Sequence, residues 1–320
     1  MTEAFTTTSV LTNLCQTAYD RLLEFALRSE PLFRNVADKK PAQQTAPGAS
    51  VVLSLYSDLA AVTSPLSEST DTDVVAASNP TQVTVTLQEY GNAAIVTRFL
   101  EATALSDVDP ALANIIAYNC ANSIDGLAQT ALATIATTHV IGTSAGSGST
   151  TITANPTKTN LTGTNLISSA AVRYIVAKLR ANNVVPTRGN LYTAYIHPEV
   201  SHDLRAETGS GGWRESHITG APDVIWPGEI GQYEGAAFVE NSRCLSDTGG
   251  SSSARLFNTY FLGQQALAEA SAVEPHIVIG PVIDRLARFR PIGWHAILGW
   301  SLYRTAASYK LWTSSSIHAT

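Results

Sequence analysis

Charged residues are scarce in this chain. Asp, Glu, Lys and Arg make up 14% of its 320 residues, whereas an average soluble domain has about 25%. Ala, Ser, Thr and Gly take their place, and hydrophobic residues still reach 44%, which is enough for a substantial core. Because a monomer keeps a charged surface for solubility, this composition favours a protein that covers its surface with copies of itself, although many secreted β proteins share it.

Basic residues are too few for a nucleic-acid-binding domain. The formal net charge is −6, whereas proteins that grip nucleic acid carry a basic footprint. This balance argues against tight nucleic-acid binding as the main function. It does not exclude a container for nucleic acid, because a wall that bound DNA tightly would hinder its packing and release.

Cysteine and long apolar runs are also in short supply. The chain has three cysteines, Cys15, Cys120 and Cys244, which are far apart and form no CxxC pair. This pattern predicts plain thiols in a reducing cytoplasm, not a disulfide framework or a zinc site. No signal-peptide run follows the polar start, and no stretch approaches the roughly 20 apolar residues of a membrane helix. We therefore expect no targeting segment and no membrane span.

Nucleotide-binding and metal-binding signatures are missing as well. The chain contains no P-loop and no GxGxxG fingerprint. The nearest approach to a metal site is a short run in which His197, Glu199, His202 and Asp203 offer imidazole and carboxylate ligands. Their spacing matches no HExxH-type signature, so a capped helix start with exposed polar side chains is the preferred interpretation. We expect no catalytic residue, no cofactor and no bound metal.

The N-terminal part of the chain is predicted to be an arm followed by a long ribbon. Residues 1–48 have too little apolar surface to fold alone, although Thr12 to Ser29 has helical spacing. Residues 49–100 carry strand signals at Ser50–Tyr56 and Thr81–Leu87, separated by a stretch rich in Ser, Thr, Asp and Pro. An isolated two-stranded ribbon is only marginally stable in water and needs a surface to lie on. If its own domain cannot supply that surface, a neighbouring subunit must.

The charge of this ribbon is lopsided. Lys and Arg are absent from Pro41 to Thr97, so the ribbon is either a solvated acidic loop or a strap that docks on a basic patch. A candidate patch lies near the C-terminus, where Asp284 is the only acid among several basic residues that include Lys310. The predicted contact residues are the ribbon acids Asp58, Glu68, Asp71, Asp73 and Glu89 and the basic residues Arg285, Arg288, Arg290 and Arg304.

The rest of the chain alternates helix and strand signals, which predicts an α+β fold. A long helix is expected over residues 107–137, with Asp107 and Asp109 at its start, Pro110 just inside and Gly126 as its weak point. The stretch 142–163 is expected to be a loop or a weak hairpin, and the stretch 209–235 is expected to be irregular. Further helices are predicted at Asn165–Asn182, after His197-Pro198 and at Gln264–Ala270, and strands at Leu191–Ile196, Ala236–Glu240, Leu256–Leu262, Pro275–Ile279, Leu286–Arg290 and Trp294–Lys310.

Several sequence segments, and the order in which they follow one another, resemble the major capsid proteins of tailed phages with the Hong Kong 97-type fold. The most specific are YIHPEVSHDLR and GEIGQYEGAAFVE, both within the block from Leu191 to Glu240. Two others come earlier in the chain: LQEYG before a strand, and DPALANIIAYNCANSIDGLAQTAL, which looks like the family's spine helix. The resemblance covers most of the chain, apart from the loops at 142–163 and 246–254.

This resemblance implies an α+β capsid fold with an arm, an extended ribbon (E-loop), a spine helix, a peripheral domain and an axial domain. It assigns residues 1–48 to the N-terminal arm, 49–100 to the ribbon and first peripheral strands, 101–189 to the peripheral domain with the spine helix, 190–270 to the axial domain and 271–320 to the C-terminal strands of the peripheral domain.

The function that the resemblance implies is that of a coat subunit. Copies of the chain would form the pentamers and hexamers of an icosahedral phage head around double-stranded DNA, assembled in the host cytoplasm and carried in the virion. Some members of the fold crosslink through a Lys and an Asn, but this ribbon lacks Lys, so non-covalent arm and ribbon contacts are expected. A separate scaffolding protein, a portal and a decoration protein are the expected partners, with no membrane and no sequence-specific DNA contact.

Three other functions stay open. An encapsulin-like nanocompartment shell shares the fold and differs in enclosing an enzyme in place of DNA. A hydrolase or metalloenzyme would need a clustered site, which the sequence does not display. A tail or decoration protein of the virion would be more completely β and would lack a spine helix.

Overall fold

The computed structural model describes most of the chain that follows the expected N-terminal helix. The predicted helix over Thr12 to Ser29 lies outside the described residues. These are residues 31–41, 50–56, 79–103, 108–136, 138–141, 152–154, 157–207, 229–281 and 288–318, with single positions between 59 and 77 and at 284 and 286.

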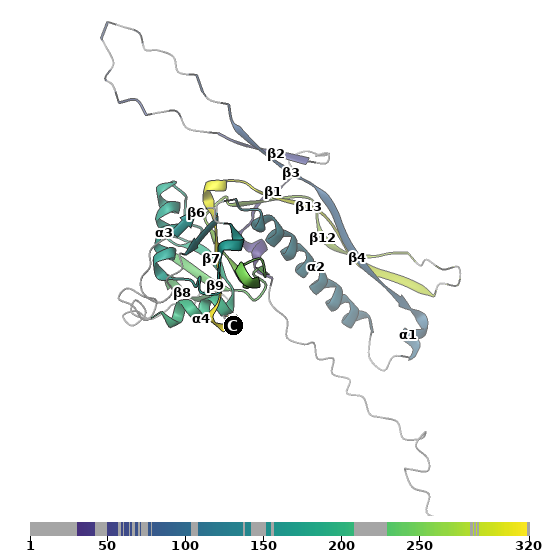
Figure 1. The fold of residues 1–320 in the computed structure, drawn as a ribbon. Coiled ribbons are helices and arrows are strands. Elements are labelled where there is room, and N and C mark those ends of the chain that lie inside the picture. The colour runs from purple at the N-terminus through teal and green to yellow at the C-terminus, as the bar shows by residue number, and fades with distance from the viewer. Residues whose placement is uncertain are drawn as a thin grey trace, which may run out of the picture.

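Two β-sheets lie side by side, and the long helix α2 (Val108–Ala133) runs along one of them (Figure 1). This arrangement of helix and sheet confirms the predicted α+β class. Sheet I consists, in order, of β1 (Asp38–Pro41), β12 (Leu267–Ile279), β13 (Phe289–Leu302) and β4 (Gln88–Thr97). Sheet II consists, in order, of β6 (Ile152–Ala154), β5 (Thr138–Ile141), β14 (Ser308–Thr313), β11 (Leu256–Leu262), β7 (Tyr192–Ile196), β9 (Ala236–Glu240) and β8 (Glu229–Tyr233), with β10 (Ser246–Asp247) beside β11.

Sheet I is built around its longest strand, β13. β13 pairs antiparallel with β12 and β4, and β1 adds a short parallel edge to β12, so this end of the expected arm lies on its own subunit. The predicted short helix over Gln264–Ala270 is wrong, because residues from Leu267 onward pair with β13. Ala-rich composition favours a helix only weakly, and pairing on both sides of the strand overrides it.

Helix α2 covers one face of sheet I and confirms the predicted long helix. Ile116 and Ile124 of α2 lie in one buried cluster with Trp294 of β13. The indole N–H of Trp294 donates to Oδ1 of Asn119 on α2 at 2.9 Å, which fixes the helix on the sheet. None of the helices that the structure describes combines the length and the apolar character of a membrane span.

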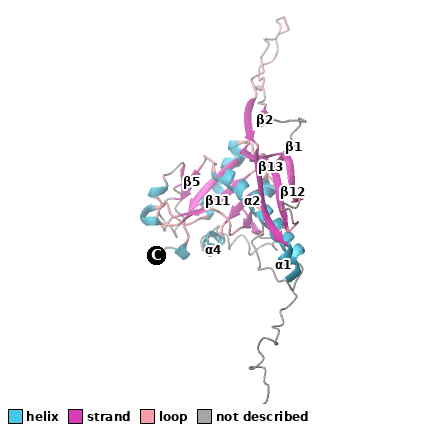
Figure 2. Ribbon diagram, turned by 90° about the vertical axis from the view of Figure 1, so that its right-hand side faces the viewer, coloured by secondary structure: helices cyan, strands magenta, loops and turns pink. Residues whose placement is uncertain are grey.

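A two-stranded ribbon leaves one end of sheet I. Its strands, β2 (Ser50–Leu55) and β3 (Thr81–Thr86), pair antiparallel as predicted. At its base Val85 is buried against Ala270 and half-buried Ile297 of sheet I. Figures 1 and 2 show β2 and β3 extending past this contact, away from both sheets. Among its described residues, the ribbon therefore rests on its own subunit at its base.

Sheet II holds the larger core. β7 is buried at every position, as predicted for this apolar run. Helix α3 (Ser169–Ala181) and helix α4 (Pro198–Ala206) add buried residues such as Ile175 and Leu204 to this core. The expectation that residues 209–235 are irregular is wrong at their end, because β8 pairs antiparallel with β9 there.

The two sheets do not follow the segments expected from the sequence. β14 falls in the 271–320 segment but lies between β5 and β11 in sheet II. Helix α3 falls in the 101–189 segment but packs in the core of sheet II. The chain crosses between the sheets from β11 to β12 and again from β13 to β14, so contiguous segments cannot match the sheets. The division into domains stays a prediction.

Candidate functional site

The β2–β3 ribbon carries large apolar side chains beyond its base. Val51, Leu53 and Val85 share one face of the ribbon, because Val51 lies opposite Val85 in the register and side chains alternate along a strand. On the other face Val52 is 51% exposed, and Tyr56, just past β2, is 79% exposed. Apolar side chains exposed on a projecting ribbon are typical of a protein-contact surface.

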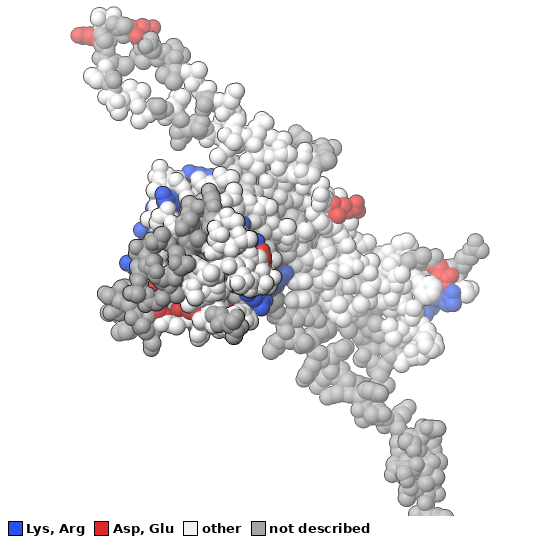
Figure 3. All heavy atoms as spheres, in the orientation of Figure 1, with Lys and Arg blue, Asp and Glu red and all other residues white. Residues whose placement is uncertain are grey.

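The acidic character predicted for the ribbon lies mainly at its far end. Glu68 and Asp71 are exposed there, and Figure 3 shows acidic side chains at the end of the ribbon away from the sheets. Asp58 and Asp73 lie outside the described residues. A contact between this end of the ribbon and the predicted basic residues of sheet I would therefore need a neighbouring subunit or a bent ribbon.

Glu89, the last predicted ribbon acid, does not lie on the ribbon. It lies on β4 of sheet I, where its Oε1 is 2.8 Å from Nε2 of His295 on the neighbouring strand β13. The Glu89 side chain remains 73% exposed. The sequence missed this partner because the two residues are 206 positions apart.

Two of the predicted basic residues lie at the end of sheet I farthest from the ribbon. Nε of Arg288 donates to Oδ2 of Asp284 at 2.6 Å, and its guanidinium lies 5.1 Å from the ring centroid of Phe289. Arg290 is half-buried on β13. Arg285 lies outside the described residues. Arg288 is an accessible cation at this end, with a side chain that is 56% exposed.

Arg304 and Lys310 lie elsewhere, so the basic residues do not form one patch. Arg304 follows β13, a strand of 14 residues, which at about 3.3 Å per residue puts it roughly 45 Å from Arg290. Its Nη2 donates to the carbonyl oxygen of Asn182 at 3.1 Å. Lys310 is buried, and its Nζ donates to the carbonyl oxygen of Ala133 at 2.8 Å. The predicted basic cluster is split, and the contact role of its members stays a prediction.

A second apolar surface, which the sequence reasoning missed, lies beside Arg288. Helix α1 (Arg98–Thr103) follows β4, and the backbone N–H of Arg98 donates to the carbonyl oxygen of Arg288 at 2.9 Å. This contact places α1 next to the ends of β12 and β13. We call the exposed side chains here the distal apolar patch: Ile95, Phe99, Leu100, Ile279 and Leu286.

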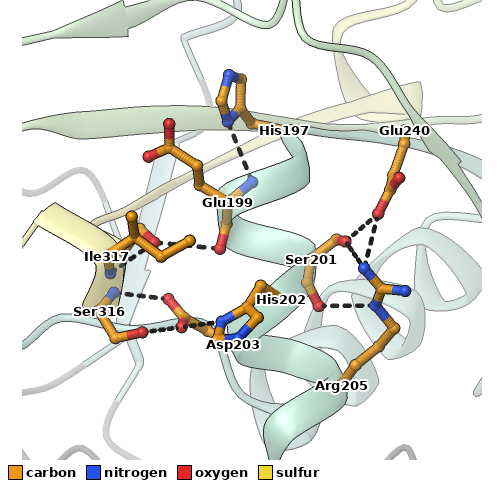
Figure 4. A network of polar contacts seen from close by, with 10 residues as sticks. His197, Glu199, Ser201, His202, Asp203, Arg205, Glu240, Ser316 and Ile317 are labelled. Atoms are coloured by element: carbon orange, nitrogen blue, oxygen red, sulfur yellow. Dashed lines mark hydrogen bonds and ion pairs between the residues drawn. The ribbon is translucent and has the colours of Figure 1, made fainter.

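The polar run at the start of α4 contacts the C-terminal segment of the chain (Figure 4). Nδ1 of His197 accepts the backbone N–H of Glu199 at 3.3 Å, which confirms the predicted cap. Asp203 is buried, contrary to expectation, and accepts the backbone N–H of Ser316 at 2.9 Å together with its hydroxyl. Nowhere in the described part of the chain do three His, Cys, Asp or Glu side chains gather as metal ligands would.

Comparisons of sequence and structure agree on what this chain resembles. A family model described as phage capsid protein matches residues 16–309. No curated protein matches the chain in sequence. The capsid structure of cyanophage P-SCSP1u matches with a TM-score of 0.70 and 16% identity over 96% of this chain and 95% of that chain.

Two further solved structures give the same result. The head structure of Helicobacter pylori bacteriophage KHP40 has a TM-score of 0.69 and 13% identity over 98% of this chain and 99% of its own. The structure of Mycobacterium phage Che8 has a TM-score of 0.64 and 16% identity over 93% and 97%. At these identities the structural matches establish a shared fold across nearly the whole chain.

Proposed function

Since the chain belongs to the phage capsid protein family, we propose that it is the coat subunit whose pentamers and hexamers build an icosahedral tailed-phage head around double-stranded DNA. The observation that carries the proposal is the match to capsid subunits along nearly the full length of both chains. The ribbon supports it, because a monomer would leave its apolar side chains and the distal apolar patch in water. Neighbouring copies in a closed shell would cover both surfaces.

Each part of the subunit has a place in this proposal. Sheet I with α2 corresponds to the peripheral domain and spine helix of a Hong Kong 97-type subunit. Most of sheet II corresponds to the axial domain, which surrounds the five-fold and six-fold axes, and β14 returns to it. The β2–β3 ribbon is the E-loop, and residues 1–48 are the N-terminal arm. The root of that arm, residues 31–41, lies on its own subunit.

Contacts between subunits would combine apolar and charged surfaces. The exposed outer side of Arg288 can donate hydrogen bonds to a carboxylate such as that of Glu68 from a neighbouring ribbon. Arg304 lies at the opposite end of β13, so it would meet a different neighbour. Exposed ion pairs contribute about 0–1 kcal/mol each, so the apolar surfaces would supply most of the cohesion.

Other components of a phage head complete the proposal. Assembly in the host cytoplasm would use a separate scaffolding protein and a portal, with a decoration protein on the finished shell. DNA would be enclosed without sequence-specific contacts, in line with the net charge of −6. The ribbon has no Lys for a covalent link, so non-covalent contacts would hold the shell.

Cryo-electron microscopy of the protein expressed together with its neighbouring genes tests this function. We expect closed icosahedral shells in which the ribbon of one subunit lies over the next. DNA inside the shells would support a phage head, whereas an enzyme cargo would identify a nanocompartment of the same fold. Monomers or small oligomers with the ribbon folded back on its own subunit would refute the coat function.

A further inference from the structure

Residues 32–34 form a wedge between sheet I and sheet II. Phe33 is 0% exposed and lies in the core of sheet II, with its ring centroid 5.0 Å from that of Tyr195. The hydroxyl of Tyr195 donates to the carbonyl oxygen of Leu32 at 2.8 Å. Arg34 points to sheet I, where its Nε and Nη2 donate to the two carboxylate oxygens of Glu269 at 3.0 Å and 2.6 Å. This short segment therefore binds both sheets.

Asp125 of α2 holds the wedge from the helix side. Its side chain is buried, and Oδ1 accepts the backbone N–H groups of Phe33 at 2.7 Å and of Arg34 at 3.2 Å. Oδ2 lies 3.0 Å from Nη1 of Arg243. Burial raises the pKa of Asp125, while Arg243 and the two N–H groups oppose that rise. One carboxylate thus connects α2, the wedge and a residue that belongs to the sheet II part of the chain.

Arg243 reaches α2 from the loop that follows β9. Its Nη2 donates to the carbonyl oxygen of Asn122 at 3.0 Å, and its own carbonyl oxygen accepts the side-chain amide of Gln129. Together with its contact to Asp125, these hydrogen bonds join Arg243 to more than one turn of α2. Gly126 lies beside these contacts and is the position of lowest helix propensity there, about 1 kcal/mol less favourable than Ala.

This joint lies where α2 passes from one core to the other. Ile116 and Ile124 pack in the core of sheet I, whereas Ala128 and Leu132 pack in the core of sheet II. Asp125 lies between the α2 residues that pack in the core of sheet I and those that pack in the core of sheet II. Densely packed apolar cores resist deformation, so the polar contacts at the boundary between the two cores determine how one sheet is oriented against the other.

The Asp125–Arg243 pair has an unused capacity for hydrogen bonding. Oδ2 and Nη1 are within ion-pair distance, but they are not aligned as a hydrogen bond, and neither atom has another hydrogen-bond partner within the described residues. Buried pairs of this kind are better suited to selecting an arrangement than to adding stability, because their desolvation offsets much of their attraction.

Resting on the proposed coat function, we propose that Asp125 and Arg243 are positioning residues for shell assembly, which set the angle between sheet I and sheet II and thereby the fit of one subunit to the next. The same chain must meet its neighbours in both pentamers and hexamers of a closed shell. A joint with defined partners holds that angle within the narrow range that closure allows. The wedge connects this joint to the root of the N-terminal arm, so the joint would also set the direction in which the arm leaves the subunit.

The test removes the charge from each side of the pair. Asp125→Asn keeps an acceptor oxygen for the N–H groups of Phe33 and Arg34, and Arg243→Met keeps an unbranched chain without the guanidinium. The matched control is Arg205→Met, which removes an arginine that pairs with Glu240 at 3.2 Å on the surface of the sheet II part. Each variant is expressed with the neighbouring genes, its folding is followed by circular dichroism, and its particles are imaged by cryo-electron microscopy.

We expect wild-type protein and Arg205→Met to give closed shells of one diameter. Asp125→Asn and Arg243→Met should fold but give at least about tenfold fewer closed shells, with a broader range of diameters. The double variant should be no worse than the worse single variant, because both changes break one pair. Wild-type yield and diameter in both single variants would overturn the proposal.

Two contingencies are covered. If Asp125→Asn does not fold, Arg243→Lys takes its place in the test. Lysine keeps the positive charge but lacks the two guanidinium nitrogens that contact Asn122 and Asp125 together. Normal shells from both Arg243→Lys and Arg243→Met would refute the joint. If wild-type protein forms no closed shells, the coat function fails, and the joint is judged on the subunit. Amide hydrogen exchange at residues 31–41 should then rise about tenfold in Arg243→Met and not in Arg205→Met, and equal exchange would refute it.

Discussion

His197 lies at the N-terminus of α4 with its Nδ1 3.3 Å from the backbone N–H of Glu199, so the imidazole accepts a hydrogen bond as a helix cap. Its ring also packs against Phe257, with centroids 4.6 Å apart. Burial lowers the pKa of His197, because the charged imidazolium would lose its hydration there. Protonation would also remove the lone pair that accepts the Glu199 N–H.

The free energy of unfolding should therefore fall in mild acid. The pKa of His197 is lower in the folded chain than the roughly 6.5 of an unfolded histidine, so below that pH the unfolded state binds more protons. This contribution is fully present above about pH 6.5 and is lost as the pH falls toward the folded value. Urea unfolding of the free subunit at pH 5.5 and pH 7.5 checks it. His197→Asn, which keeps a capping acceptor without the titration, should show a smaller difference; an equal difference would contradict the assignment.

Removing Arg34 should destabilise the subunit itself. Arg34→Met leaves the carboxylate of Glu269, which is 1% exposed, without its paired guanidinium. Breaking a buried pair costs about 3–5 kcal/mol, and because the Arg34 side chain is 25% exposed we expect a loss of about 2–3 kcal/mol. Denaturant unfolding measures the loss, with Arg205→Met as the exposed control at under about 1 kcal/mol. A change in Arg34→Met no larger than that of the control would show that Glu269 finds other partners.

Gly299 should be required for the ribbon to rest on sheet I. A Cβ at this position would overlap the carbonyl oxygen of Thr86 at the base of β3. Gly299→Ala must therefore push the ribbon base off the sheet, at about 1–3 kcal/mol of overpacking. Gly126→Ala is the matched control, because its Cβ would meet only Nη2 of Arg243, at 4.0 Å. Thermal unfolding should place the midpoint of Gly299→Ala below that of wild type and that of Gly126→Ala at or above it, and a wild-type midpoint for Gly299→Ala would mean that β3 moves aside without cost.

The elements with strong local signals could be predicted from the sequence. The buried strand β7 and the helix start at His197-Pro198 follow from an apolar run and a proline at the first helical position. The start of β12 could not be predicted, since its Ala-rich residues favour helix until β13 and β1 pair with them. The place of β14 in sheet II depends on strands far away in the sequence, and no local pattern carries that information.

The candidate contact residues divide in the same way. The pair Arg288–Asp284 is four residues apart in the chain and lies within reach of sequence reasoning. The pairs that organise the interior are distant, as for Arg34 and Glu269, which are 235 positions apart. A cluster of basic residues in the sequence is therefore no guide to a basic patch once a strand as long as β13 separates its members.

Charge reversal at Arg288 tests the proposed strap between subunits. Arg288 is the variant of choice because its side chain is 56% exposed, whereas Arg290 is half-buried and its reversal would disturb the fold. Arg288→Glu should lower the thermal stability of assembled shells, through repulsion of the neighbouring ribbon acids, and leave the free subunit within about 0.5 kcal/mol of wild type. High salt should reduce the difference in thermal stability between wild-type shells and Arg288→Glu shells, because salt screens exposed charges.

A second reversal identifies the partner. If the ribbon end of a neighbour meets Arg288, Glu68→Arg combined with Arg288→Glu should restore part of the lost shell stability, since the attraction is rebuilt with its signs exchanged. Differential scanning calorimetry of purified shells gives both values. Arg288→Glu shells that form and melt like wild type would refute the ionic contact between Arg288 and the neighbouring ribbon. The exposed apolar side chains of the ribbon, Val52 and Tyr56, would then hold the neighbour. Loss without rescue would instead trace the effect to the contacts of Arg288 with Asp284 and Phe289 in its own subunit.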